Sequence, residues 1–237
     1  IIRYIIRRTD MYYMKSFILV VCLMANIIIG QNFSGYGGYW LGVYPIDWSS
    51  LNSKMTNLQI GKFNNSMVLH GGGGAGKVYK NIYIGGLGFG GQSLLANAVD
   101  DVDRKVEINL GMGGIYIESS WKLIKNIELI TGSAIMWGGI EIHVTRDGGV
   151  NNWDNIWDSY SDATSTHTHS FTTTVTNNFT MIYPYASLRY PIFPWFGLEG
   201  SVGYFQTFYD NNEWSVTGTQ EIGLSRPIYR ISTVFGG

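Results

Sequence analysis

The sequence predicts an all-β protein, an eight-stranded antiparallel up-and-down transmembrane β-barrel preceded by a signal peptide. Three observations predict it. Apolar residues recur at every second position through most of the chain, which is the strand period. The connections between these segments alternate between long and short. Charged residues make up only 14% of the chain and aromatic residues 15%, whereas an average domain is about a quarter charged.

The N-terminal region is typical of an export signal. Lys15 precedes an apolar run over residues 17–29, which ends at Gly30. A basic start, about a dozen apolar residues and a small residue describe a secretory signal peptide, and the run is shorter than the ~20 residues of a transmembrane helix. We therefore expect residues 14–30 to be a signal peptide and residues 1–13 to be an upstream extension outside the fold.

The remaining residues, 31–237, read as a single barrel domain made of strands. One helix is expected to begin near Ser49 and Ser50 and to run through Leu58. Alternation places Ile108, Leu110, Met112 and Tyr116 on one strand face and Glu107, Asn109, Gly111 and Gly113 on the other. A bulge at Gly138 and Gly139 is expected to keep Ile140, Ile142 and Val144 on the apolar face of Ile135 and Trp137. The predicted strands are 35–44, 66–79, 82–91, 104–123, 127–145, 179–190, 196–209 and 227–236.

The connections between these strands differ in length in a regular order. Three are tight turns, at residues 80–81, 124–126 and 191–195. The other four are long: 45–65, 92–103, 146–178 and 210–226. A membrane barrel with both ends on the periplasmic side has short periplasmic turns and long outer loops in this order. Ten strands are an alternative if residues 45–65 or 210–226 form a further hairpin.

The two faces of the predicted strands indicate a membrane barrel. In such a barrel apolar side chains face lipid and the interior is polar. The minority face is mostly small, so we expect Gly86, Gly88, Gly90, Gly111 and Gly113 to line a narrow interior. Buried charges require partners. We expect an interior charge network made of Lys77, Glu107, Glu128, Arg189, Glu199 and Arg230.

The connection 146–178 is the most distinctive segment of the chain. It contains aromatic residues and histidines that we expect to contact an extracellular partner or a glycan: Trp153, Trp157, Tyr160, His167 and His169. Its aspartates and the two histidines also raise the alternative of a metal site, but their spacing does not fit the EF-hand pattern, and we predict neither a metal nor a cofactor. A solvated loop without a ligand remains the simpler interpretation.

In its exported start, its eight alternating segments and its order of connections, the chain resembles the small outer-membrane barrels of the OmpA and OmpX type. The resemblance covers residues 31–237 and carries no catalytic motif. It implies location in the outer membrane of a Gram-negative-type envelope, contact with outer-membrane lipid, and insertion by the barrel-assembly machinery. The closing segment 229–235 resembles the terminal strand that this machinery recognises.

The expected function is a structural or surface-interaction role carried by the extracellular loops. A narrow pore is the first alternative, although eight strands leave little lumen. A rim-located hydrolase is the second, with His143 and Glu141 as a His–carboxylate pair and His70 nearby; we predict no enzyme. A soluble exported sandwich is the third. The net charge of −1 offers no basic surface for a nucleic acid.

Overall fold

The computed structural model describes residues 34–57, 59–99, 102–124, 126–147, 170–209, 214–216 and 222–236. The predicted signal peptide and the upstream extension lie outside these residues. The elements are β1 (Gly35–Tyr44), α2 (Ser49–Asn57), β2 (Met67–Tyr79), β3 (Ile82–Val99), β4 (Val102–Ile124), β5 (Ile127–Asp147), β6 (Ser170–Phe193), β7 (Phe196–Phe208) and β8 (Arg226–Gly236). Among the residues that the structure describes, no helix is long and apolar enough to span a membrane.

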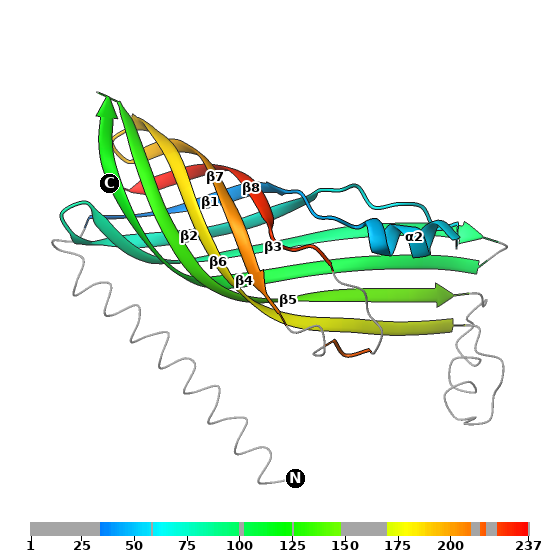
Figure 1. Cartoon of the computed structure of the whole chain (residues 1–237). Coiled ribbons are helices and arrows are strands. Elements are labelled where there is room, and N and C mark those ends of the chain that lie inside the picture. Colours follow the sequence, from blue (N-terminus) through cyan, green and yellow to red (C-terminus); the bar gives the residue numbers. More distant parts are fainter. Residues whose placement is uncertain are drawn as a thin grey trace, which may run out of the picture.

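The eight strands form a closed antiparallel ring in chain order, as predicted (Figure 1). The ring closes where β8 pairs with β1, from Tyr36 opposite Gly236 to Val43 opposite Tyr229. The tight turns lie at the end of the ring where β1 begins and β8 ends. Within the described parts of 45–65 and 210–226, the structure contains α2 and one isolated bridge instead of a further hairpin. The ring therefore has eight strands and not ten.

Four neighbouring strands are much longer than a bilayer crossing requires. β3, β4, β5 and β6 have 18, 23, 21 and 24 residues, against ~9–11 for a tilted transmembrane strand. β3 runs to Val99 and β6 begins at Ser170, beyond the predicted ends of these strands. Their extensions form a curved wall at the end of the ring opposite the tight turns (Figure 1). Most of the predicted loop 92–103 is thus strand, and so are residues 146–147 and 170–178 at the two ends of the predicted loop 146–178.

The outer surface of the ring is apolar. Large hydrophobic side chains are exposed on every strand, including Ile115 at 60% and Ile231 at 68%, and Trp195 in the turn between β6 and β7 is 61% exposed. Removal of apolar side chains from water is the main favourable contribution to the free energy of folding. A soluble sandwich would therefore turn these side chains inward. The outward apolar surface is that of a membrane-spanning barrel and excludes the soluble sandwich.

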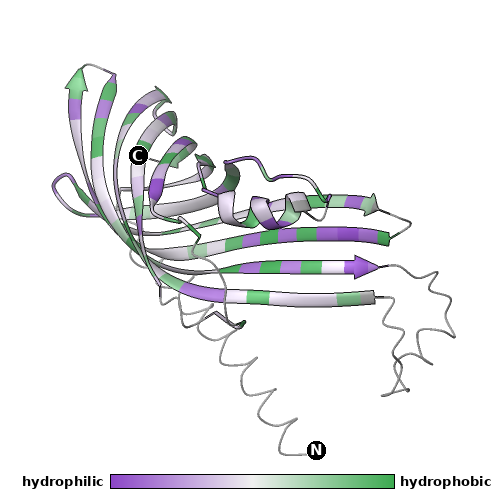
Figure 2. Cartoon of the chain, turned by 45° about the vertical axis from the view of Figure 1, so that its right-hand side comes forward, coloured by the Kyte–Doolittle hydropathy of each residue, from purple (hydrophilic) through white to green (hydrophobic). Residues whose placement is uncertain are grey.

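The apolar face changes sides part-way along β4 and β5. In the ring, Ile115 and Ile135 point outward and are exposed, whereas in the extensions Ile108 and Ile140 are fully buried. The pairing of β4 with β5 runs without a shift through Gly138 and Gly139, so the predicted bulge is wrong and Ile140, Ile142 and Val144 point inward. The apolar face follows the surroundings: hydrocarbon outside the ring, and a packed cap inside the wall (Figure 2).

The cap is the segment 45–65, which contains α2 and lies along the long strands (Figure 1). Trp48, Met55, Ile60 and Phe63 are buried in the same hydrophobic cluster as Ile108 and Ile140. The Asn52 side chain holds the segment together, because its amide donates to the carbonyl of Phe63 and its oxygen accepts from the Phe63 amide. The wall and the cap together resemble a small soluble sheet with one covered face.

Inside the ring, aromatic side chains are packed where glycines were predicted. Trp40, Phe89, Tyr183 and Phe205 form a chain of ring contacts with centroids 4.8–6.2 Å apart. A few inward glycines make room for these rings: a Cβ on Gly203 would lie 2.3 Å from the Tyr183 ring. The predicted interior glycines alternate with buried residues such as Leu87 and point outward instead, namely Gly86, Gly88, Gly90, Gly111 and Gly113.

Candidate functional site

The interior of the ring contains a three-residue ion network. Glu199 on β7 lies between Arg189 on β6 and Arg230 on β8. One carboxylate oxygen of Glu199 accepts from Nη2 of Arg189 at 2.8 Å, and the other accepts from Nη2 of Arg230 at 2.8 Å. The side chains of Glu199 and Arg230 are only 5% and 3% exposed. The structure thus brings together three of the six residues predicted for an interior charge network.

A second carboxylate, Glu118 on β4, was not predicted. It is buried and accepts hydrogen bonds from the hydroxyls of Tyr36 and Tyr185. The Arg189 guanidinium lies over the Tyr36 ring, 4.1 Å from its centroid, so Glu118 and the ion network form one continuous polar cluster. A signal was present in the sequence, because Ile115 and Ile117 point outward and a carboxylate one position further on must face the interior.

The polar cluster and the aromatic rings together close the lumen. The Arg230 guanidinium lies over the Trp40 ring at 4.3 Å, and the Tyr44 ring packs edge-on against Phe205 with centroids 5.1 Å apart. Tyr44 and Tyr183 are fully buried. Eight-stranded barrels have interiors just wide enough for side chains to fill. Packed side chains therefore fill the described interior of the ring.

Lys77 and Glu128 lie apart from this cluster, toward the tight-turn end. Both line a cavity of about 280 Å³ that also contacts Arg189, Tyr36 and Tyr83. The Lys77 ammonium lies 6.0 Å from the centroid of the Tyr83 ring. Glu128 accepts a long hydrogen bond of 3.4 Å from the Ser120 hydroxyl. These two predicted residues thus lie inside the barrel, but at its mouth and not in the ion network.

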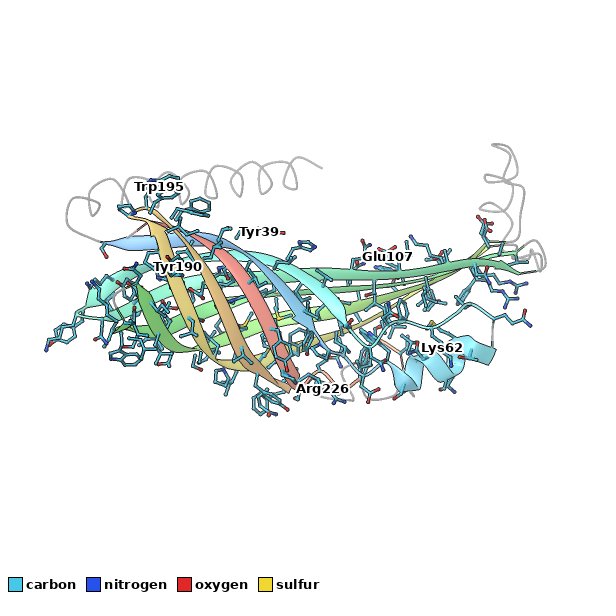
Figure 3. All side chains as sticks on the ribbon, turned by 90° about the horizontal axis from the view of Figure 1, so that it is seen from above. Tyr39, Lys62, Glu107, Tyr190, Trp195 and Arg226 are labelled. Atoms are coloured by element: carbon cyan, nitrogen blue, oxygen red, sulfur yellow. The ribbon has the colours of Figure 1, made fainter. Side chains whose placement is uncertain are left out.

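Glu107 does not point into the barrel, and its predicted place in the interior network is wrong. It lies on the outer face of the wall, on the side away from the cap (Figure 3). Its carboxylate contacts the Lys105 ammonium at 2.6 Å and accepts from the amides of Gln92 and Asn109. The prediction failed because Glu107 lies in the extension of β4, where the apolar side chains face inward.

These contacts predict a pH effect at Glu107. The hydrogen bond from Lys105, followed by those from Asn109 and Gln92, lowers the pKa of Glu107 from its ordinary 4.5 to about 2. A lowered pKa stabilises the fold above the ordinary value, and this stabilisation is lost as pH falls toward 2. We expect Lys105→Met to raise the pKa of Glu107, measured by carboxyl-carbon NMR titration. Lys54→Met on α2 is the control, and a wild-type midpoint near 4.5 would contradict the assignment.

The residues considered for a hydrolase lie on the outer surface of the strands. The His143 Nε2 lies 3.5 Å from a Glu141 carboxylate oxygen, and its Nδ1 lies 3.0 Å from the Thr174 hydroxyl. His70 on β2 contacts the Tyr39 hydroxyl through Nδ1 at 2.6 Å. His143 and His70 belong to separate clusters. The predicted loop residues Trp153, Trp157, Tyr160, His167 and His169 lie outside the described residues.

The exposed aromatic side chains lie in part where interfacial girdles are expected. Figure 3 shows Trp195, Tyr190 and Tyr39 on the outside of the ring. Tyr and Trp are enriched where a membrane meets water. Tyr36, Trp40 and Tyr44, which are also near strand ends, are turned inward and belong to the packed interior.

Neither a family model nor a curated protein matches the sequence. Solved structures with similar folds include the attachment invasion locus protein Ail of Yersinia pestis in complex with the heparin analogue sucrose octasulfate, with a TM-score of 0.41, 10% identity, and coverage of 86% of this chain and 96% of that one. Acinetobacter baumannii CarO has a TM-score of 0.39, 12% identity, and coverage of 85% and 97%. The Escherichia coli outer-membrane protease OmpT has a TM-score of 0.28, 10% identity, and coverage of 86% and 94%.

The closed antiparallel ring of eight strands with an outward apolar surface is the architecture that the sequence predicts. At identities of 10–12%, the activities of these proteins do not transfer to this chain. The fold itself follows from the strand pairing and the outward apolar surface of this chain.

Proposed function

We propose that this chain is an outer-membrane barrel whose closed ring serves as an anchor for a surface-interaction platform. The platform consists of the wall formed by the extensions of β3–β6, the cap 45–65 and the loop between β5 and β6. The observation that carries the proposal is the inversion of the apolar face along β4 and β5. On the ring side of the inversion, the outward side chains are apolar and suit lipid. On the wall side, the outward side chains are polar and suit water, and the inward side chains form a packed core.

The inversion matters because it distinguishes a folded domain with its own core from strands that only extend beyond the membrane. Trp48 is fully buried in the cap, and the Asp47 carboxylate pairs with Arg226 at the start of β8 at 3.2 Å. The cap is thus fixed both to the wall and to the ring. A rigid support of this kind lowers the entropic cost of binding a partner.

The packed lumen makes a pore the weaker candidate, and conductance tests it. We expect the purified protein to insert into planar bilayers without stepwise ion conductance, because Trp40, Phe89 and Tyr183 occupy the lumen. Trp40→Ala/Phe89→Ala removes two of these rings and serves as the positive control, since it opens space along the axis. Conductance steps in the wild-type protein would favour the pore.

Surface interaction is tested on intact cells. Cells that display the full chain are expected to adhere to at least one class of immobilised glycan, and the triple variant Trp153→Ser/Trp157→Ser/Tyr160→Ser is expected to lose this adhesion. Trp195→Ser is the matched control, since Trp195 is an exposed tryptophan at the opposite end of the barrel. Equal adhesion by the triple variant and the wild type would remove the loop aromatics from the proposal.

A further inference from the structure

The outward residues of β4, β5 and β6 change from apolar to polar over a short distance. Cross-strand pairing places them in rows. In order from the tight-turn end, the rows are Ile115–Ile135–Ile182, then Gly113–Trp137–Thr180, then Gly111–Gly139–Asn178, then Asn109–Glu141–Thr176. Three steps of two residues along a strand cover about 20 Å. The row of Gly111 and Gly139 therefore lies where the hydrocarbon ends and the polar headgroups begin.

A groove follows this row. It has a volume of about 350 Å³ and is lined by Asn109, Gly111, Gly139, Glu141 and Asn178, among others. The volume falls in the range of about 300–1,000 Å³ that small-ligand sites occupy. A Cβ added to Gly111 would meet no atom within 4 Å, and one added to Gly139 would meet the Asn178 side-chain oxygen at 3.2 Å. Because no side chain projects from Gly111 or Gly139, the backbone at these two positions forms the floor of the groove.

The walls of the groove carry hydrogen-bonding groups of both kinds. The Glu141 carboxylate accepts hydrogen bonds, and its side chain is 55% exposed. The carboxamides of Asn109 and Asn178 each donate and accept. None of the lining residues is a lysine or arginine, the side chains that best bind phosphate. Hydroxyl and amine groups suit these walls better than an anion does.

An exposed aromatic ring lies on the apolar side of the groove. Trp137 is 54% exposed and is two residues from Gly139 on the same strand face, with Glu141 two residues to the other side. The face of an indole ring carries partial negative charge and attracts the C–H groups of a sugar ring. Trp137 thus offers an apolar contact on one side of the groove floor, and Glu141 offers a polar contact on the other side.

We propose that this groove binds a neutral or amine-bearing sugar in the headgroup of a membrane glycolipid. The lipid chains would lie along the apolar rows below, beside Ile135 and Ile182, and hold the sugar at the level of the groove. Such an anchor raises the effective concentration of the sugar. The inference requires that the ring spans a membrane, and it depends neither on the loop between β5 and β6 nor on closure of the lumen.

Fluorine NMR of fluorotryptophan-labelled protein tests the groove directly. The protein is placed in phosphatidylcholine nanodiscs with increasing amounts of monoglucosyl diacylglycerol, and the Trp137 signal is assigned with Trp137→Phe. We expect a saturable shift of this signal in the wild type. Gly111→Leu fills the floor and is expected to abolish the shift. Gly200→Leu, at an outward glycine on β7 that also has open space around it, is expected to keep it.

Three results would overturn the proposal. They are a Trp137 signal that does not respond to the glycolipid, a response that survives in Gly111→Leu, and an equal response to free methyl glucoside at the same concentration. The last of these would assign the groove to a soluble sugar. Since both leucine variants place a side chain on the outer surface, recovery of the folded barrel by gel mobility without boiling shows that any loss is local. None of these readouts depends on conductance or cell adhesion.

Discussion

Replacement of Glu199 by leucine is expected to lower the free energy of unfolding by ~3–5 kcal/mol, the usual cost of leaving buried charges without their partner. Among the described residues, Glu199 is the carboxylate that forms ion pairs with both Arg189 and Arg230. Without it, two guanidiniums remain inside the ring, and Glu118 is held by the hydroxyls of Tyr36 and Tyr185. Urea unfolding in phosphatidylcholine vesicles measures the loss.

Two further variants separate charge pairing from packing. Arg189→Met/Glu199→Leu/Arg230→Met removes all three charges, and apolar groups of similar volume often replace a buried ion network without loss of stability. We expect this variant to recover most of the stability that Glu199→Leu loses. Glu107→Gln removes a carboxylate at the surface and is expected to lower stability much less than Glu199→Leu does, because exposed ion pairs contribute little. If Glu107→Gln were as damaging as Glu199→Leu, the assignment of inward and outward residues on β4 would be wrong.

Gly203→Leu is expected to have the second largest effect. A Cβ at this position would lie 2.3 Å from the Tyr183 ring and 2.8 Å from the Pro184 carbonyl oxygen. Since Tyr183 is itself wedged against Phe205, it has no free space into which to move. Overpacking of this kind costs ~1–3 kcal/mol, and we expect a lower midpoint of urea unfolding together with incomplete folding into vesicles.

Gly200→Leu is the matched control on the same strand. Gly200 points outward, and nothing lies within 4 Å of the Cβ that would be added. A leucine there adds apolar surface that lipid covers, so the unfolding midpoint is expected to stay within error of the wild type. A wild-type unfolding midpoint for Gly203→Leu as well as for Gly200→Leu would mean that the interior is loosely filled, which would also favour a pore.

The strands were predictable because each crossing of the ring has a period of two and the tight turns are short. α2 was predictable for a related reason: Met55 is spaced for burial and the serines suit a helix start. The ends of β3 and β6 were not, since residues 92–99 do not alternate between apolar and polar and residues 170–178 are mostly polar. Their strand structure depends on pairing with β4, β5 and the cap, which no local pattern reveals.

The site was harder to predict than the fold. Alternation tells which residues share a face, but not which face is inside. The apolar face was assigned to lipid everywhere, which placed Arg189, Glu199 and Arg230 correctly and Glu107 on the wrong side. The same assumption put the glycines inside, although the interior is filled by rings such as Trp40 and Phe89. Only the position of a residue relative to the membrane boundary resolves the ambiguity.

The position of Arg230 has a consequence for assembly. It lies on the last strand, yet its guanidinium covers Trp40 on the first strand and pairs with Glu199 on the strand before it. Because β8 follows the other seven strands of the ring in the chain, a sheet without β8 holds water where the packed core forms. Pairing of β8 with β1 therefore expels this water and forms the interior contacts of Arg230 in the same step. A chain without β8 can form neither the closed ring nor these contacts.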